Sequence, residues 1–176
     1  MIYRFLFAFV LVASLMLSKN IAFAQTVSVM TYNLRLDIPS DGVNAWPNRR
    51  KALSQQVAWL APDVMGVQEA LPQQLSYLRE NLLGYDFVGI GRKAALGDEA
   101  TAIFYDRNRF EVLTSNTFWL SETPAEVSMG WGASYPRIAT YVHLRDRNSG
   151  EELFAFNAHL DHKAQEARVN GIALIS

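Results

Sequence analysis

The sequence contains no cysteine, which excludes a disulfide framework and a lipoprotein lipidation site. It also has no low-complexity tract, internal repeat or linker, and nothing in it marks a second domain. Half of the residues are hydrophobic and the charged fraction is moderate, which is typical of a globular protein. A single domain that depends on its hydrophobic core alone is therefore predicted.

An excess of positive charge is absent as well. The chain has 16 basic and 17 acidic residues, a formal net charge of −1. Without residues 1–24, which hold Arg4 and Lys19, 14 basic residues stand against 17 acidic ones and the net charge becomes −3. A polyanionic substrate would have to be held by a local site or a metal ion, because no globally basic face is available.

No apolar run is long enough for a transmembrane helix, which needs about 20 residues. Residues 5–17 are apolar and follow Arg4, but polar residues interrupt the run at 18–20. Ala22-Phe23-Ala24 then forms a small-x-small cleavage signal. This pattern predicts a signal peptide over residues 1–24, a mature domain over 25–176, and export to the periplasm or the exterior. An uncleaved membrane anchor is the alternative.

The first half of the mature chain alternates strands and helices. Residues 27–34 and 64–67 are β-branched and apolar enough for buried strands. A helical pattern opens at Pro47 and ends before Pro62, and leucines spaced three and four residues apart predict a second helix over 71–82. This order predicts an α/β layered domain.

The second half changes to short strands joined by polar turns, typical of a meander. The segment 121–134, rich in polar residues and glycine, predicts a surface loop near a cleft, and 164–175 predicts a helix. Because no strand follows that helix, the C-terminus is interpreted as premature. The predicted strands are 85–90, 101–105, 110–118, 138–144 and 152–160.

Polar side chains gather at the predicted strand ends. Asn33, Glu69 and the pair Asn157 and His159 follow apolar strands, and Glu99 precedes the strand 101–105. In layered α/β folds ligands bind at this rim. A glutamate with an asparagine nearby predicts a partial Mg²⁺ site. Each residue also has a structural alternative: a turn cap for Asn33, a helix-dipole partner for Glu69 and a solvated turn for Glu99.

Other chemistries lack their motifs. The residues His159, Asp161 and His162 cannot all point one way on a strand, so they do not make a tight zinc site. No serine lies in a Gly-x-Ser-x-Gly elbow, and a glycine-rich phosphate loop is absent.

The same polar residues lie within five ordered segments that span the mature chain. Together these segments resemble the signature motifs of the endonuclease/exonuclease/phosphatase superfamily, which includes secreted DNases, sphingomyelinases and inositol polyphosphate phosphatases. The resemblance implies a DNase I-like four-layer α/β sandwich. The segments are Met30-Thr31-Tyr32-Asn33-Leu34-Arg35, Val67-Gln68-Glu69, Gly97-Asp98-Glu99 leading into Ile103-Phe104-Tyr105, Tyr135-Pro136-Arg137-Ile138-Ala139, and Asn157-Ala158-His159-Leu160-Asp161-His162.

The resemblance also implies roles for individual residues. Glu69 would be the principal ligand of Mg²⁺ or Mn²⁺, and Asn33 would help to hold the metal and the phosphate. His159 would contact the scissile phosphate and would be oriented by Glu99, which is expected to raise its pKa. Arg137 and the asparagine of the Asn-x-His motif, Asn157, would bind the phosphate. A surface ion pair is the alternative for Arg137.

Two motifs of the superfamily are missing, a later Gly-Asp-x-Asn and a final Ser-Asp-His. They supply the water-orienting aspartate and the other catalytic histidine, so the sandwich is expected to be incomplete at its C-terminus and weak or inactive alone.

The leading hypothesis is a monomeric, Mg²⁺-dependent phosphoric ester hydrolase. Its substrate would be a nucleic acid, a phospholipid head group or a sugar phosphate. The alternatives are a non-catalytic domain that binds a phosphate or sugar ligand and an unstable truncated product.

Overall fold

The computed structural model describes residues 26–94 and 97–176, so the predicted signal peptide lies outside the described residues. Every helix and strand predicted for the mature chain is present. In the described residues no helix is long and apolar enough to span a membrane. In chain order the elements are β1 (Val29–Asn33), η1 (Pro39–Asn44), α1 (Trp46–Leu60), β2 (Val64–Ala70), α2 (Pro72–Asn81), β3 (Tyr85–Val88), β4 (Ala100–Asp106), β5 (Phe110–Trp119), β6 (Ile138–Asp146), β7 (Glu152–Ala158) and α3 (Gln165–Ile175).

The strands form two sheets, one with the order β1-β2-β4-β3 and the other with the order β5-β6-β7. Strands β1 and β2 run parallel, and all other pairs are antiparallel. The prediction that all strands of the second half form one meander is therefore wrong. Only β5 to β7 do so, whereas β3 and β4 turn back and pair in the first sheet.

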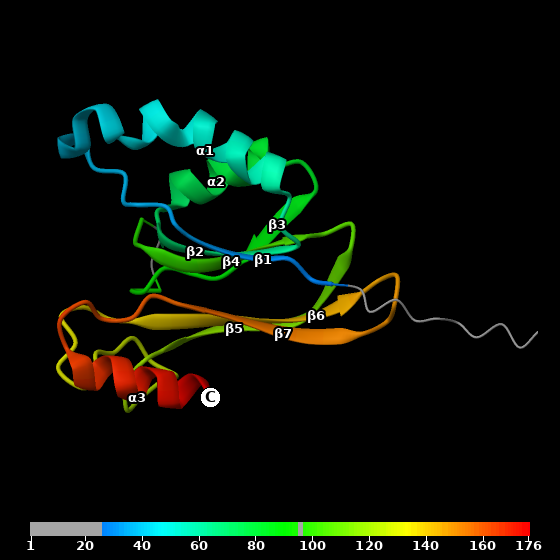
Figure 1. Ribbon diagram of the computed structural model, residues 1–176. Coiled ribbons are helices and arrows are strands. Elements are labelled where there is room, and N and C mark those ends of the chain that lie inside the picture. The colour runs from blue at the N-terminus through cyan, green and yellow to red at the C-terminus, as the bar shows by residue number, and fades with distance from the viewer. Residues whose placement is uncertain (1–25, 95–96) are drawn as a thin grey trace, which may run out of the picture.

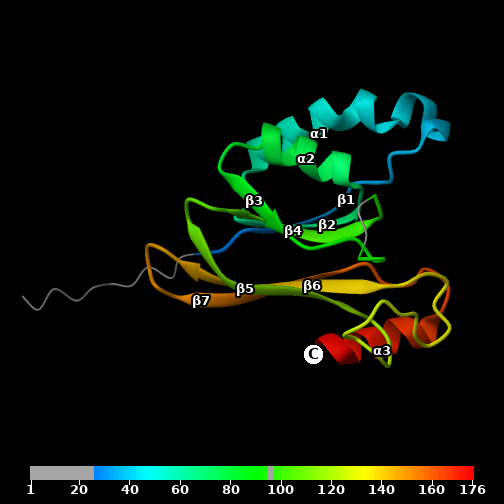
Figure 2. The same cartoon turned by 180° about the vertical axis from the view of Figure 1, so that it is seen from behind.

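The sheets lie face to face, and helices cover their outer faces (Figures 1 and 2). Helices α1 and α2 lie on the first sheet, and α3 lies beneath the second (Figure 1). This helix, sheet, sheet, helix arrangement is the four-layer α/β sandwich that the resemblance implies.

Alternation along the strands builds two apolar layers. In β2 and β4, Met65 and Phe104 face α1 and α2, while their neighbours Val64 and Ile103 face the second sheet. A strand has a side-chain period of two, so each strand of a central sheet supplies both layers. The first layer is completed by helix residues such as Val57 and Leu78, which are fully buried.

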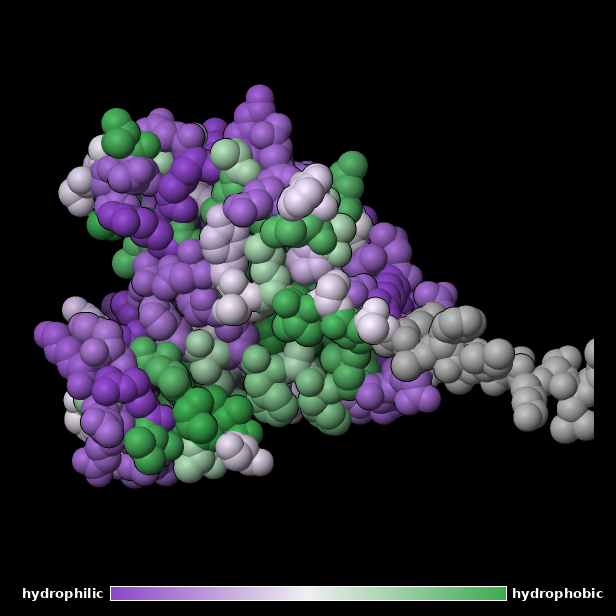
Figure 3. Space-filling model, viewed as in Figure 1, coloured by the Kyte–Doolittle hydropathy of each residue, from purple (hydrophilic) through white to green (hydrophobic). Residues whose placement is uncertain are grey.

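Strand β7 shows the two faces predicted for it. Leu153 and Ala155 pack into the core between the sheets. Phe154 points outward and is 57% exposed, and Phe156 on the same face is 49% exposed. Figure 3 shows hydrophobic residues gathered on the face of the molecule that carries β1, β7 and α3. In the described part of the chain, β1 and β7 are each the last strand of a sheet on this face.

Candidate active site

Strand direction brings the polar motifs to one end of the sandwich. Strands β1, β2 and β7 end there, and the antiparallel strands β4 and β6 begin there. Asn33 is the last residue of β1, His159 follows β7, and Glu99 and Arg137 immediately precede β4 and β6. Residues distant in sequence are thus brought to the same edge, as the sequence predicted.

Glu69 occupies an unusual backbone conformation near the end of β2. The register between β2 and β4 shifts between Val67 and Ala70, as at a β-bulge, and Glu69 has a φ of +56°. Left-handed conformations are costly for residues other than glycine and concentrate at functional sites. The bulge turns the carboxylate toward β1, where Oε1 accepts a 2.9 Å hydrogen bond from Asn33 Nδ2.

The loop after β1 completes this pair. Leu36 N donates to Glu69 Oε2 over 3.0 Å, and Arg35 N donates to Asn33 Oδ1 over 2.8 Å. Asn33 therefore makes the turn contact of its structural alternative and also contacts Glu69. Glu69 is not a cap for α2, because the N-cap residue there is Leu71, whose N–H donates to Gln74 Oε1.

The donor set fits Mg²⁺ or Mn²⁺, which bind few protein oxygens and keep several waters. Glu69 is a carboxylate with one hydrogen bond to each oxygen, so lone pairs remain for a cation. Among the described residues no group of three or more His, Cys, Asp or Glu side chains could hold a metal. The chemistry of Glu69 and Asn33 thus matches a hydrated hard cation and not zinc.

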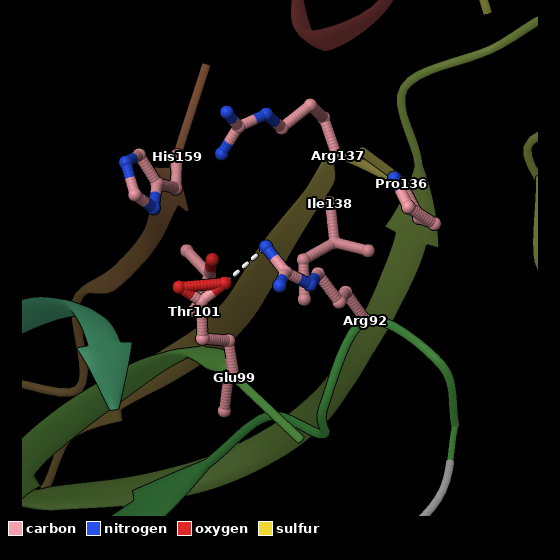
Figure 4. Close-up of a pocket in the computed structure, with 8 residues that line it drawn as sticks. Arg92, Glu99, Thr101, Pro136, Arg137, Ile138 and His159 are labelled. Carbon is pink, nitrogen blue, oxygen red and sulfur yellow. Dashed lines mark ion pairs between the residues drawn. The ribbon is translucent and has the colours of Figure 1, made fainter. Parts of the chain in front are cut away.

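His159, Arg137 and Arg92 border a small cavity at the same end of the sandwich, and their side chains approach it from three parts of the chain (Figure 4). The cavity measures about 10 Å³, close to the space that a single water needs. Glu99 and Thr101 also line this cavity. The sequence therefore places an imidazole, two guanidinium groups and one carboxylate around a water-sized space.

Arg137 is 6% exposed, so the surface alternative for this residue is wrong. Its Nε donates to Asp161 Oδ2 over 3.2 Å, and Nη2 lies 3.0 Å from Nδ1 of His162. Asp161 in turn accepts hydrogen bonds from three backbone N–H groups, those of Ser134, Lys163 and Ala164. A buried carboxylate anchored in this way fixes the guanidinium at the cavity.

Glu99 is 8% exposed, which excludes the solvated turn. Its carboxylate forms an ion pair with Arg92 (Figure 4), and among the described residues no hydrogen bond joins it to His159. The predicted orientation of His159 by Glu99 is therefore not the arrangement in the structure. Burial raises the pKa of Glu99, and Arg92 offsets part of that rise.

The pKa of His159 is lowered, and not raised as was expected from a carboxylate beside it. Burial lowers this pKa, and the positive charge of Arg137 lowers it further, while the negative charge of Glu69 acts in the opposite direction. Because the cationic form is disfavoured both by desolvation and by nearby cations, the imidazole of the free protein is neutral at pH 7.

Asn157 lies between the sheets, 7% exposed, and does not face the cavity. Its Nδ2 donates to the carbonyl oxygens of Val67 and Ala102, both at 2.8 Å, and its Oδ1 accepts from Gln68 Nε2 at 2.6 Å. The side-chain amide of Asn157, predicted to bind the phosphate, is thus hydrogen-bonded within the protein. Val67 in β2 and Ala102 in β4 are paired where the register between these strands shifts. By bonding to both carbonyl oxygens, the amide of Asn157 joins β7 to the first sheet.

Sequence reasoning missed Arg92. It lies in the loop before β4, and its backbone is held by Glu99 and by Trp119, whose Nε1 donates to Arg92 O over 2.6 Å. A basic residue after two glycines and an isoleucine carries no distinctive motif. Only the folded chain reveals that Arg92 and Arg137 share a site.

Comparison with known proteins shows which families contain structures similar to this chain. No protein-family model matches the chain. An endonuclease/exonuclease/phosphatase of Bacteroides vulgatus is 40% identical with a TM-score of 0.84, and the match covers 86% of this chain and 59% of that one. A mannosyl-6-phosphatase of Bacteroides thetaiotaomicron is 37% identical with a TM-score of 0.82, over 85% of this chain and 57% of that one. Among curated proteins, an uncharacterised protein of Acanthamoeba polyphaga mimivirus is 28% identical over 139 residues, 72% of this chain and 50% of that protein.

These matches define the class as a DNase I-like α/β sandwich. The chain belongs to the endonuclease/exonuclease/phosphatase superfamily. It spans between 50% and 59% of the length of these three relatives.

Proposed function

We propose that this chain carries the metal-binding and phosphate-binding part of a Mg²⁺-dependent phosphoric ester hydrolase. The observation that carries the proposal is the meeting of four side chains at one end of the sandwich. Glu69 is turned by the strained bulge onto Asn33, Arg137 and His159 border a cavity at the same end, and the charge of Glu69 acts on the pKa of His159. Superfamily membership supports a phosphoesterase, and the arrangement supports one that uses a cation.

Glu69 and Asn33 would hold the metal. When bound, the metal neutralises charge on the phosphoryl oxygens and lowers the pKa of a water. Arg137 would bind a phosphate oxygen with the guanidinium that Asp161 holds in place. His159 would donate a hydrogen bond to the phosphate, and the anion would raise its pKa and favour the charged form. Asn157 would position His159 by fixing β7 to the first sheet.

The substrate class is a small phosphorylated molecule or a phosphodiester. A relative at 37% identity is a mannosyl-6-phosphatase, which favours a sugar phosphate. The negative balance of the chain also disfavours a long polyanion, because no globally basic face would hold it.

A second proposal is that turnover needs more polypeptide than the matched part. The relatives are longer, and the chain matches only 59% of the first. In the described residues Glu69 is not part of a group of three or more His, Cys, Asp or Glu side chains that could hold a metal. We therefore expect this chain alone to bind Mg²⁺ and phosphate with little hydrolysis.

We also propose that the protein is exported; residues 1–24, which carry the predicted signal peptide, lie outside the described part.

The test measures binding and turnover on the full chain with and without Mg²⁺. The probes are inorganic phosphate for calorimetric binding and 4-nitrophenyl phosphate for hydrolysis. Glu69→Gln should weaken Mg²⁺-dependent phosphate binding by about tenfold or more, because it removes the ligand charge. Glu80→Gln, a change of an exposed glutamate on α2, is the matched control and should have no effect.

Equal phosphate binding by wild type and Glu69→Gln would contradict the metal role of Glu69. Rapid hydrolysis by the chain alone that Glu69→Gln abolishes would confirm the enzyme and refute the need for more polypeptide. Phosphate binding without turnover would favour the non-catalytic or incomplete form.

A further inference from the structure

Arg92 borders the candidate site, but the proposed function gives this positively charged residue no role. Its guanidinium borders the same cavity as Arg137 and His159 (Figure 4), and the side chain is 17% exposed. Two contacts fix its backbone: Arg92 N donates to Glu99 O over 2.9 Å, and Trp119 Nε1 donates to Arg92 O. A rigid backbone and a guanidinium at the cavity make Arg92 a preorganised ligand-binding group.

The polar atoms around this guanidinium are incompletely satisfied. Among the described residues, Arg92 Nε is a buried side-chain polar atom that has no hydrogen-bond partner, and Glu99 Oε2 has only its ion pair with Arg92. Arg92 Nη1 contacts Glu99 Oε2 as an ion pair, and Asp98 Oδ1 lies 3.5 Å from Nε, too far for a good hydrogen bond. Buried unsatisfied groups are rare, and each needs an explanation such as a missing ligand.

An aromatic ring links the two guanidinium groups. The ring centroid of Tyr135 lies 5.0 Å from Cζ of Arg92 and 5.9 Å from Cζ of Arg137. The ring also stacks on His162. Tyr135 therefore packs against both guanidinium groups that border the cavity.

The size of the cavity restricts which anion fits. About 10 Å³ holds one water-sized group, so a phosphate oxygen fits and an ester substituent does not. A phosphate monoester has three terminal oxygens and about two negative charges near neutral pH, whereas a diester has two terminal oxygens and one charge. Both the steric limit and the second guanidinium therefore favour the monoester.

We propose that Arg92 is a specificity-determining residue that binds the third terminal oxygen of a phosphate monoester in this cavity and selects monoesters over diesters. The guanidinium borders the cavity that takes this oxygen, while Nη1 stays with Glu99. Glu99 keeps its ion pair with Arg92 beside the bound phosphate, and burial raises the pKa of this carboxyl. The inference rests on the proposed phosphate site.

The experiment compares two ligands on the full chain in the presence of Mg²⁺. Calorimetry measures the Kd of phenyl phosphate, a monoester, and of diphenyl phosphate, a diester. Wild type should bind the monoester about tenfold more tightly or better. Arg92→Gln should weaken monoester binding by about tenfold and change diester binding less than twofold, and Arg92→Lys should recover part of the loss because it restores the charge.

Arg79→Gln, which changes an exposed arginine on α2, is the matched control and should leave both constants unchanged. An equal loss for both ligands in Arg92→Gln would show a structural role and overturn the inference, as would a wild type that prefers the diester. Either result leaves the proposed function standing. If wild type binds neither ligand with Mg²⁺, the proposed function fails and this inference fails with it.

Discussion

At the residue scale, the conformation of Glu69 sets the geometry of the site. A glutamate with a φ of +56° costs about 1–2 kcal/mol compared with an ordinary strand residue, and glycine would adopt this conformation without that cost. The chain keeps glutamate, whose two carboxylate oxygens accept hydrogen bonds from Asn33 and Leu36. This retained strain is best explained by a functional demand on the carboxylate.

Glu69→Gly and Glu69→Ala separate strain from chemistry. Both remove the carboxylate and its hydrogen bonds, so both should abolish Mg²⁺ binding. The glycine variant should nevertheless be more stable than the alanine variant by about 1 kcal/mol in urea unfolding, because only alanine retains the strained φ.

The same pair of substitutions at Glu80, on helix α2, is the control and should give the opposite order, with alanine more stable. An alanine variant at position 69 as stable as the glycine variant would contradict the strained conformation.

Sequence reasoning at this scale predicted that Glu69, Asn33, Arg137 and His159 lie at one edge, because each lies at or next to the end of a strand within a recognisable motif. It could not find Arg92, whose importance arises from contacts with Glu99 and with Tyr135, 43 positions away in the chain. The sign of the pKa shift of His159 was also not predictable, since burial and the charge of Arg137 act through space.

At the element scale, β7 joins the two sheets through the side chain of Asn157. The close approach depends on Gly66 in β2, because a Cβ there would lie 2.8 Å from Cγ and Oδ1 of Asn157. The alternation of β7 predicted which face Asn157 occupies, but not its partners. Local strand patterns do not specify which strand lies opposite, which is also why β3 and β4 were wrongly joined to the meander.

Asn157→Ala tests whether this residue is structural. It leaves the carbonyl oxygens of Val67 and Ala102 without their donor, so unfolding free energy should fall by about 3 kcal/mol. Asn148→Ala, in an exposed turn, should change it by less than about 0.5 kcal/mol. Unchanged stability with weakened phosphate binding in Asn157→Ala would instead support a direct phosphate contact.

At the scale of the whole molecule, Arg109 links elements at the end of the sandwich opposite the candidate site. Its Nη1 donates to Asp63 Oδ1 over 2.6 Å, and its Nε donates to Asp146 Oδ2 over 2.7 Å. Burial raises the pKa of each carboxyl, but hydrogen bonds lower it by more. Asp63 accepts these bonds from Ser28 and Arg109. Asp146 accepts them from Arg109 and from backbone N–H groups. Both pKa values therefore lie below 3.8.

A carboxyl group whose pKa is lower in the folded state stabilises the fold above its unfolded pKa, and this contribution disappears as the pH falls through the folded value. The urea midpoint should thus drop when the pH falls below 3.8. Arg109→Gln should cost about 2 kcal/mol at pH 6 and show a smaller drop in acid.

Arg107→Gln, at a neighbouring exposed arginine, should behave as wild type. An equal acid drop in Arg109→Gln and wild type would show that the two carboxyl groups do not depend on Arg109.

Residues from distant strands are proposed to share one cation and phosphate site, and the three histidines of the chain allow a direct test. His159 borders the site, whereas His143 lies on the outer face of the second sheet, stacked on Phe154. In an NMR titration with Mn²⁺, a paramagnetic substitute for Mg²⁺, the His159 ring signals should broaden first, those of His143 should stay sharp, and Glu69→Gln should abolish the difference. Equal broadening of His143 and His159, or an unaffected His159, would contradict the shared site.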